Sequence, residues 1–530
     1  DSLEAIYIYG IGKATHYFYL KSWLNESSNR DLIFIEENIA AIQSFITQSC
    51  AEEILSHPQV HIRFNYNKKK PAKFIQALAQ SFPYQSIAIL SLPAYKKQFP
   101  SRFYRLRLML MRKTYIEYAY FLEKWCYAGL VVNIASNMSK IETSFDVNGL
   151  KGRFKDIPAI ICGAGPSLKS DLKKLSSLSD QALIFAGGSA ITSLTNNGIS
   201  PHFAVACDPN KEELQRFLSS SAFEIPLIYH SRLIPEVFGS LNCEYGYVSS
   251  STGGSFELWM EQKIGLQSEP LVKGLNKEAL SITLSALQIA STLGCNPIVF
   301  LGIDLAYTNG KAYAPNVFDK KENSHKSCRD KEIFHHLISR KDIYNQPTKT
   351  LVKWIMESAV ISHFTQAHPK TQFINATSGG IGFKGVLNKN LSDIDFSFSK
   401  DLYGMVHKEI QTHPLPIVDG IVDKQFLLLK NSLLECLKHI NIAMDELESK
   451  KSKNIDPETG KIIFAQMEIE TLECYFPMLH PFSIAFKVSA RRKFRTNDYT
   501  KPCYATKWKY LYSKWSGYKT LVEKYLGIFV

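Results

Sequence analysis

A repeated pattern between residues 159 and 380 constrains the fold of this chain most: a short apolar run followed at once by small or polar residues. The six runs are AIIC (159–162), ALIFA (182–186), FAVAC (203–207), PLIY (226–229), PIVFL (297–301) and TQFI (371–374). Apolar runs of this kind are typical of buried parallel strands, and open parallel sheets bind ligands at the carboxyl ends of their strands. Six such ends predict one crevice. The residues that follow the runs are Gly163–Ser167, Gly187–Ser189, Asp208–Asn210, His230–Ser231, Gly302–Asp304 and Asn375–Gly380.

Two further patterns complete the predicted fold. Near the start of the chain, the β-rich runs AIYIYGIG, DLIFIEE, QVHIRFNY and SIAILSL alternate with helical patterns, which predicts a second parallel sheet with crossover helices. After residue 424 the pattern becomes helical, with an apolar residue every three or four positions at Phe426, Leu429, Leu433, Leu437, Ile440, Met444 and Leu447. We therefore expect an α/β protein with two Rossmann-like parallel-sheet domains followed by a helical C-terminal region.

The expected domain boundaries follow these patterns. Residues 1–110 form the N-terminal Rossmann-like domain, 111–154 are connecting helices, 155–390 form the central domain, and 391–530 form the helical, basic C-terminal domain. The apolar stripe after residue 424 should pack against other helices, and the basic residues after Lys487 should stay outward.

The stretch GAGPSL, residues 163–168, is the most informative strand end. Gly163 and Gly165 allow the backbone to approach a ligand, and Pro166 suits the first turn of a helix because it has no N–H to lose. We expect the free N–H groups of Ser167 and Leu168 to face outward with the helix dipole behind them, as in a phosphate cradle. A purely structural turn is the alternative. A Walker loop is excluded, because the glycines are wrongly spaced.

The N-terminal segment contains a partial dinucleotide fingerprint. Gly10 and Gly12 follow a predicted strand, and a second predicted strand ends at Glu36 and Glu37. The third glycine of the fingerprint is absent, because residue 15 is threonine. We favour a structural Rossmann-like domain over cofactor binding here.

The charge of the chain is basic and uneven. The chain has 62 Lys and Arg residues against 49 Asp and Glu residues. The stretch from Lys487 to the end contains eleven Lys and Arg residues and two acidic residues. A second run, Lys96 to Lys113, holds seven basic residues and no acid. Such patches suit anionic partners or form a solvated face. The ten cysteines form no CxxC pair, and the apolar stretches are too short to span a membrane, so we expect a cytoplasmic protein without a transmembrane segment.

Four stretches together resemble the motility accessory factor (Maf) glycosyltransferases. They are PAIICGAGPSL, ISPHFAVACDPN, LGCNPIVFLGIDLAYTNGKAY and FINATSGGIGFKG. With YIYGIG…IFIEE and VVNIASN, the resemblance extends over about residues 5–390, and its central domain is similar to that of the 6-hydroxymethylpterin diphosphokinase-like proteins. It implies transfer of a nonulosonic acid (sialic, pseudaminic or legionaminic type) from a CMP-activated donor to a protein Ser/Thr or glycan hydroxyl. The implied partners are this nucleotide-sugar donor and a flagellin-like protein acceptor, with a homo-oligomer left open.

The central domain also resembles bacterial sialyltransferases of the lipooligosaccharide type. In that resemblance, the GAGPSL loop contacts the CMP part of the donor, and Tyr307 and Tyr313 lie near the donor phosphate. Where those enzymes carry asparagines, this chain has Ala164, Gly188–Ser189 and a nearby Asp208, which leaves the donor's sugar and nucleotide open. The candidate donor-binding residues are Gly163, Gly165, Pro166, Ser167, Leu168, Gly188, Ser189, Asp208, Gly302, Asp304, Asn375, Thr377, Gly379 and Gly380.

The implied reaction needs a stabilised leaving phosphate and a base for the acceptor hydroxyl. Hydroxyl donors such as Tyr307 and Tyr313 can stabilise the phosphate without a metal, and histidine suits the base. His325 lies where the sialyltransferases carry their base; His335, His336 and His230 are rivals. Asp304 is expected to brace its turn rather than react. No Asp-x-Asp motif stands where a metal-dependent transferase would need one, so we expect no metal and no cofactor.

Two other function classes stay open. A pterin-alcohol diphosphokinase would use the same cradle for a triphosphate with Mg²⁺, and Asp208 and Asp304 are its only candidate carboxylates at the strand ends. A non-catalytic nucleotide- or RNA-binding protein would use the basic tail.

Overall fold

The computed structural model describes residues 3–66, 71–79, 82–250, 252–266, 281–314, 336–451, 455–493 and 504–529. The chain divides into two compact units. The first contains Asp1–Tyr120, Phe318–Lys341 and Pro347–Met356; the second contains Phe121–Val317, Asp342–Gln346 and Glu357–Val530.

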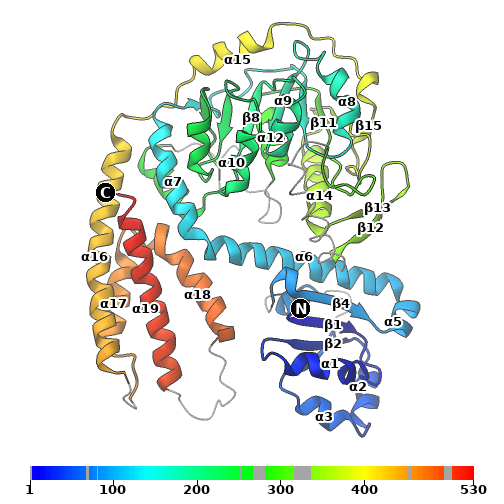
Figure 1. The fold of residues 1–530 in the computed structure, drawn as a ribbon, viewed down its shortest axis with the longest axis vertical. Coiled ribbons are helices and arrows are strands. Elements are labelled where there is room, and N and C mark those ends of the chain that lie inside the picture. The colour runs from blue at the N-terminus through cyan, green and yellow to red at the C-terminus, as the bar shows by residue number, and fades with distance from the viewer. Residues whose placement is uncertain are drawn as a thin grey trace. The chain divides into compact units, whose positions relative to one another are not determined.

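The first unit is built on a parallel sheet with strand order β3-β2-β1-β4 (Figure 1). Its strands coincide with the four predicted runs: β1 Ala5–Tyr9, β2 Asp31–Glu36, β3 Val60–Phe64 and β4 Ile87–Ser91. The helices that accompany it are α1 His16–Asn25, α2 Ile39–Ile46, α3 Ala51–Ser56, α4 Ala72–Ala79, α5 Pro93–Gln98 and the first part of α6 Pro100–Trp125. The antiparallel hairpin β12 Ile338–Lys341 and β13 Pro347–Thr350 also belongs to this unit.

The second unit contains a larger parallel sheet with strand order β15-β14-β11-β6-β7-β8-β9-β10-β5. All six predicted runs are strands in it: β6 Ala159–Cys162, β7 Leu183–Gly187, β8 Phe203–Ala206, β9 Leu227–Tyr229, β11 Ile298–Leu301 and β14 Phe373–Asn375. The sequence did not indicate β5 Phe145–Asp146, β10 Tyr245–Tyr247 or β15 Leu387–Asn388, because two or three residues carry no periodic signal.

Helices cover both faces of this sheet, so successive strand residues enter different cores. Ile160 and Ile184 join the core formed with α7 Tyr127–Ile141, whereas Ile161 and Phe185 join the core formed with α12 Ile282–Thr292. Further helices of this unit are α8 Leu168–Leu175, α9 Ser189–Thr195, α10 Lys211–Leu218, α11 Gly254–Lys263, the later part of α14 Val352–Ala367 and α15 Leu402–Gln411.

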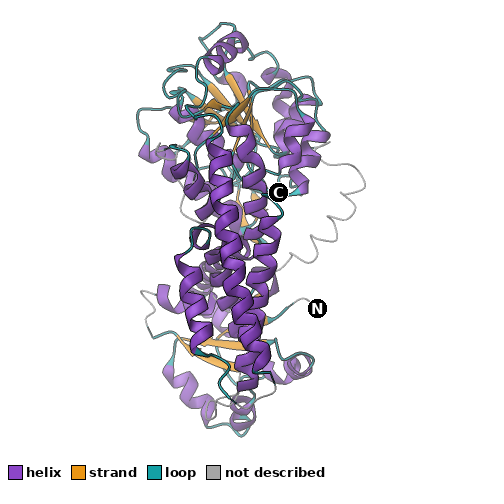
Figure 2. Cartoon of the chain, turned by 90° about the vertical axis from the view of Figure 1, so that its left-hand side faces the viewer, coloured by secondary structure: helices purple, strands orange, loops and turns teal. Residues whose placement is uncertain are grey.

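The C-terminal region is helical, as predicted, and it shares a core with the central sheet. Its helices are α16 Ile421–Ser449, α17 Gly460–Thr471, α18 His480–Lys493 and α19 Tyr504–Leu526. The predicted stripe on α16 is buried or half-buried along its length and packs with residues of α19 such as Trp515 (Figure 1, Figure 2). These residues belong to the same hydrophobic cluster as Ile160 and Ile184 of the sheet.

The expectation that the basic residues after Lys487 stay outward is wrong for part of α19. Lys507 pairs with Asp456 and Glu458, and the ammonium of Lys514 donates to Gln466 Oε1 at 2.9 Å. Burial lowers the pKa of Lys514. Lys487 and Lys509 are exposed. Lys514 is therefore held within the helical bundle, whereas Lys507 pairs at its surface.

Within the described residues, the helices that are long enough to cross a membrane are not apolar enough to do so.

The buried stripe gives a direct test of the shared core. Leu433 is fully buried on α16, whereas its neighbour Leu434 is 45% exposed. We expect Leu433→Ala to lower the free energy of unfolding by about 2–5 kcal/mol, because it leaves a cavity. Leu434→Ala should lower it by less than about 1 kcal/mol. Urea denaturation followed by tryptophan fluorescence measures both; equal effects would contradict the burial of the stripe.

Candidate functional site

The six predicted strand ends lie along one edge of the central sheet. Their strands are consecutive neighbours in the order β14-β11-β6-β7-β8-β9, and all pairs are parallel. The loops that follow them therefore meet at the carboxyl edge, as the sequence predicted. Several of their polar groups, however, bind one another, and others bind neighbouring helices and loops.

The GAGPSL loop packs tightly against the loop that follows β11. Gly165 N–H donates to the carbonyl oxygen of Gly302 at 2.7 Å. A Cβ added to Gly165 would overlap the carboxylate of Asp304, and one added to Gly163 would lie 2.9 Å from the side chain of Ile303. These glycines are thus required by the close approach of two loops. For the same reason, a valine side chain at position 165 would displace Asp304.

The prediction that Ser167 and Leu168 present free N–H groups is wrong. Ser167 N–H points to Asp304 Oδ1 at 3.4 Å, and Leu168 N–H donates to the carbonyl oxygen of Gly165 at 3.1 Å. Helix α8 begins at Leu168, two residues after Pro166, which was predicted for its first turn. The neighbouring loop binds the N–H group of Ser167, and the GAGPSL loop itself binds that of Leu168, so neither is left for a phosphate.

Asp304 braces this edge, as expected. Its carboxylate accepts hydrogen bonds from the hydroxyl of Ser167 at 2.6 Å and from that of Thr308 at 2.5 Å. The side chain is buried, and burial raises its pKa. A Cβ added to Gly380 would overlap the carbonyl oxygen of Asp304, so the β14 loop also closes onto it. This acid ties three loops together.

The other β14 candidates take part in the same bracing. Thr377 Oγ1 accepts from Ile303 N–H at 3.1 Å, and Asn375 Oδ1 accepts from Thr377 N–H at 3.2 Å. Both side chains are buried. A Cβ on Gly379 would lie 2.9 Å from Thr308 Cγ2. Asn375, Thr377 and Gly379 therefore shape the edge from beneath.

The two candidate tyrosines flank a tight turn. Asn309 and Gly310 both have positive φ, and Gly310 N–H donates to the carbonyl oxygen of Tyr307 at 3.2 Å. Asn-Gly is the preferred pair for such a turn. Ala314 N–H donates to the carbonyl oxygen of Ala164 at 2.9 Å, which fixes the segment of Tyr313 against the GAGPSL loop. Tyr307 is half-buried, and Tyr313 is 38% exposed.

A charged cluster that sequence reasoning missed lies at the ends of β7 and β8. Arg216 on α10 contacts Asp208 Oδ2 at 3.1 Å and also pairs with the buried Glu213. Burial raises the pKa of Glu213 to about 7, and the charge of Asp208 adds to the rise. The spacing Asn210-x-x-Glu213 resembles a helix N-cap pattern, and Asn210 does cap α10. The N-cap pattern accounts for Asn210 and Glu213, but it gives no indication of a role for Arg216.

The rival bases differ in their surroundings. His325 and His335 lie outside the described residues. His230 is fully buried after β9, and burial lowers its pKa to about 3, so it is a weak base without access to an acceptor. His336 belongs to the first unit, where its ring stacks on Tyr84 with centroids 4.4 Å apart.

A second cluster missed by the sequence reasoning contains two buried acids on α11. Glu257 accepts from the hydroxyl of Ser231 at 2.5 Å and from Gly253 N–H at 2.9 Å. Burial raises its pKa to about 8. The hydroxyl of Tyr247 donates to Glu261 at 2.7 Å. This network holds the ends of β9 and β10 against α11, beside the crevice.

The partial dinucleotide fingerprint of the first unit is filled by protein. A Cβ on Gly10 would lie 2.8 Å from the ring of Tyr95, whose hydroxyl donates to Glu36 Oε2 at 2.8 Å. Glu36 is buried and also accepts from Ile11 N–H at 3.0 Å. Tyr95 and Glu36 thus bind each other and the loop that carries Gly10.

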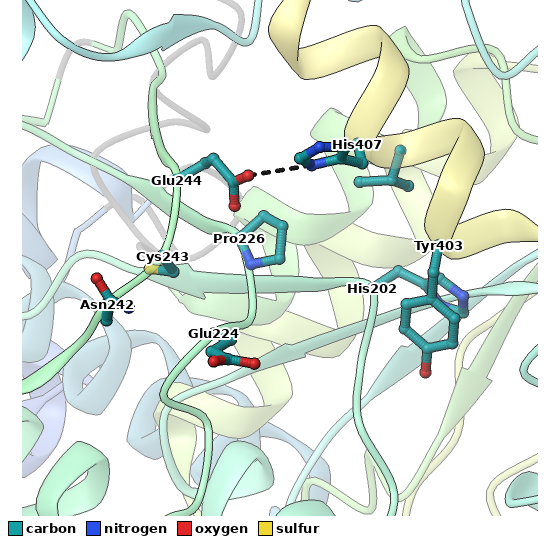
Figure 3. Close-up of a pocket in the computed structure, with 9 residues that line it drawn as sticks. His202, Glu224, Pro226, Asn242, Cys243, Glu244, Tyr403 and His407 are labelled. Carbon is teal, nitrogen blue, oxygen red and sulfur yellow. Dashed lines mark ion pairs between the residues drawn. The ribbon is translucent and has the colours of Figure 1, made fainter.

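A cavity of about 480 Å³ lies at the opposite, amino edge of the sheet (Figure 3). His202, Pro226 and Glu244 line it, each just before a strand, and His407 pairs with Glu244 at 3.1 Å. Ligands of open parallel sheets bind at the other edge, so we do not place the site here. Among the residues that the structure describes, no group of three or more His, Cys, Asp or Glu could hold a metal ion.

Comparison with known proteins supports the resemblance drawn from the motifs. Residues 132–310 match the family described as 6-hydroxymethylpterin diphosphokinase MptE-like. The chain is similar to the solved structure of the Maf glycosyltransferase from Magnetospirillum magneticum AMB-1, with a TM-score of 0.53 and 12% identity over 99% of this chain and 80% of that one. At this identity the likeness establishes the fold. No curated protein matches the sequence.

The brace at Asp304 generates a stability prediction. Asp304→Ala leaves the donors of Ser167 and Thr308 without their buried acceptor, so we expect the free energy of unfolding to fall by about 2–4 kcal/mol. Asp445→Ala, at an exposed position of α16, is the matched control and should change it by less than about 1 kcal/mol. Chemical denaturation measures both. An Asp304→Ala protein as stable as the control would rule out the brace.

Proposed function

We propose that this chain is a glycosyltransferase that moves a nonulosonic acid from a CMP-activated donor to a protein Ser/Thr or glycan hydroxyl without a metal. The observation that carries the proposal is the position of Tyr313 at the carboxyl edge, held against the GAGPSL loop through Ala314. The MptE-like match and the likeness to a structure titled as a Maf glycosyltransferase support the same class.

The carboxyl edge suits a donor that leaves with one phosphate. During transfer the bond between the sugar's anomeric carbon and the phosphate oxygen breaks, and its electron pair stays on the departing CMP. Charge thus develops on a phosphate oxygen, where neutral hydroxyl donors stabilise it. Tyr307 and Tyr313 come from one turn at this edge and are the proposed donors. Backbone hydrogen bonds hold the turn that carries them, so little reorganisation of its backbone is needed during the reaction.

The acceptor hydroxyl forms the new bond to the anomeric carbon and must lose its proton. We retain His325 as the proposed base on the sialyltransferase resemblance alone, because it lies outside the described residues. His230 is disfavoured by its burial and low pKa. Glu257 is buried beside the same edge but is occupied by Ser231 and Gly253. Cytoplasmic location and a flagellin-like acceptor are parts of the same proposal.

A diphosphokinase is the second candidate, favoured by the MptE-like match over residues 132–310. Such an enzyme needs carboxylates for Mg²⁺ beside two adjacent phosphates. Asp304 is buried and accepts from Ser167 and Thr308, so of the two candidate acids only Asp208 is left for a metal. The lack of a second available carboxylate beside Asp208, in the described part of the chain, is the reason to rank the transferase first.

The metal requirement separates the two candidates. With a CMP-nonulosonic acid as donor, we expect transfer or donor hydrolysis to persist at an unchanged rate in excess EDTA. Product release is followed by chromatography of CMP. Loss of activity that Mg²⁺ or Mn²⁺ restores would favour the diphosphokinase, which should then be assayed with a pterin alcohol and ATP.

The tyrosines give a second test. If their hydroxyls stabilise the leaving phosphate, Tyr307→Phe and Tyr313→Phe should each lower kcat by about tenfold or more, with donor KM changing by less than about threefold. Tyr344→Phe, an exposed tyrosine of the same unit, should leave both constants unchanged. Weaker donor binding at normal kcat would instead assign the hydroxyls to binding of the ground state.

A further inference from the structure

We infer that Arg216 recognises the oxyanion of the donor and that Asp208 occupies its guanidinium until the donor binds. This inference rests on the proposed function, because it assigns a role in the same crevice. It adds a recognition residue that the motifs did not indicate and reverses the role predicted for Asp208.

The position of Arg216 is the first support. Asp208 follows β8 and Gly188 follows β7, and these strands are neighbours in the sheet. A Cβ added to Gly188 would have only Arg216 within 4 Å, with Nη1 at 3.9 Å. The guanidinium thus lies beside the backbone at the end of β7, with no side chain between them. Arg216 reaches the carboxyl edge from α10 at the point where two strand ends meet.

The unequal burial of its two carboxylate partners is the second support. Glu213 is 1% exposed, whereas the side chain of Asp208 is 46% exposed. One guanidinium is shared by two acids, so the cluster carries a surplus of negative charge when both are ionised. Water can solvate Asp208 when it leaves, but not Glu213. Asp208 is therefore the partner that a ligand anion can replace, and Glu213 is the one that keeps Arg216 oriented.

The donors of the guanidinium are the third support. Both ion pairs use Nη1, and the buried Nε has no hydrogen-bond partner among the described residues. A guanidinium offers five N–H donors in a fork that matches phosphate or carboxylate. Burial raises the pKa of Tyr313, and the charge of Arg216 opposes that rise while the charge of Asp208 adds to it. A phosphate near Tyr313 would lie within reach of the same charge.

If Arg216 only neutralised Glu213, replacing it would leave the ratio of the CMP and cytidine dissociation constants unchanged. We compare CMP with cytidine by titration calorimetry, because the ratio of their dissociation constants measures the contribution of the phosphate. Arg216→Lys keeps the charge but loses the fork. We expect Arg216→Lys and Arg216→Met to weaken CMP binding by about tenfold or more and cytidine binding by less than about threefold. Arg153→Met, an exposed arginine paired with Glu409, is the control and should bind both as the wild type does.

Asp208→Asn tests the exchange. It removes the internal competitor, so CMP should bind several-fold more tightly than to the wild type, most clearly at low salt. Weaker binding would overturn the exchange and return Asp208 to direct donor contact. If Arg216→Met leaves Glu213 unpaired and the protein unfolds, the double variant Glu213→Gln/Arg216→Met removes that buried charge and gives the same readout.

Binding measurements with other ligands identify the oxyanion and separate this inference from the proposed function. A variant with a normal CMP-to-cytidine ratio but weakened binding of a free nonulosonic acid would assign Arg216 to the sugar carboxylate, which also supports oxyanion recognition. Arg216-dependent binding of UMP or AMP in place of CMP would support the inference and refute the proposed donor. Arg216→Met with wild-type affinity for CMP and for the free acid would overturn the inference alone. A wild-type protein that binds no nucleotide, phosphate or free acid would overturn both.

Discussion

The buried carboxylate of Asp304 is the contact on which the carboxyl edge of the central sheet depends. It receives the hydroxyls of Ser167 from the β6 loop and Thr308 from its own loop, and the β14 loop closes over its backbone at Gly380. A buried ionisable group is costly unless its hydrogen bonds are made, so the three loops cannot move independently. Gly165 of GAGPSL follows from this contact, because a side chain there would occupy the position of the carboxylate.

This constraint divides the polar residues of the edge into two groups. Ser167, Asn375 and Thr377 are buried and bind neighbouring loops, so they give the edge its shape. Tyr313 and Asp208 remain partly exposed and can meet a ligand. Because braced loops hold the backbone of these exposed groups, less order has to be gained when a ligand binds there.

The strands and the fold class were predictable from the sequence. The division of the edge into buried groups that bind neighbouring loops and partly exposed groups was not. Six apolar runs marked six strands, because a strand buried on both faces needs no periodicity beyond its apolar length. The outward N–H groups of Ser167 and Leu168 were predicted from the loop alone, and the partner that satisfies Ser167 stands 137 residues away. Arg216 gave no signal because its importance comes from Asp208 and Gly188, which only the fold brings beside it. Local patterns identify strand ends, but not which polar groups bind each other across them.

The shared core changes how the helical region can be assigned a role. Trp515 and Tyr518 of α19 lie in the same hydrophobic cluster as Ile160 and Ile184 of the central sheet. Removing residues 484–530 would therefore expose that core, and lost activity would report unfolding rather than lost acceptor recognition. Lys507 and Lys514 are already engaged within the bundle, so the charge left to attract an acidic acceptor is carried by exposed residues such as Lys487 and Lys509. Charge reversal at those two positions, with the bundle intact, separates attraction of an acceptor from stability of the fold, because exposed substitutions leave the core unchanged.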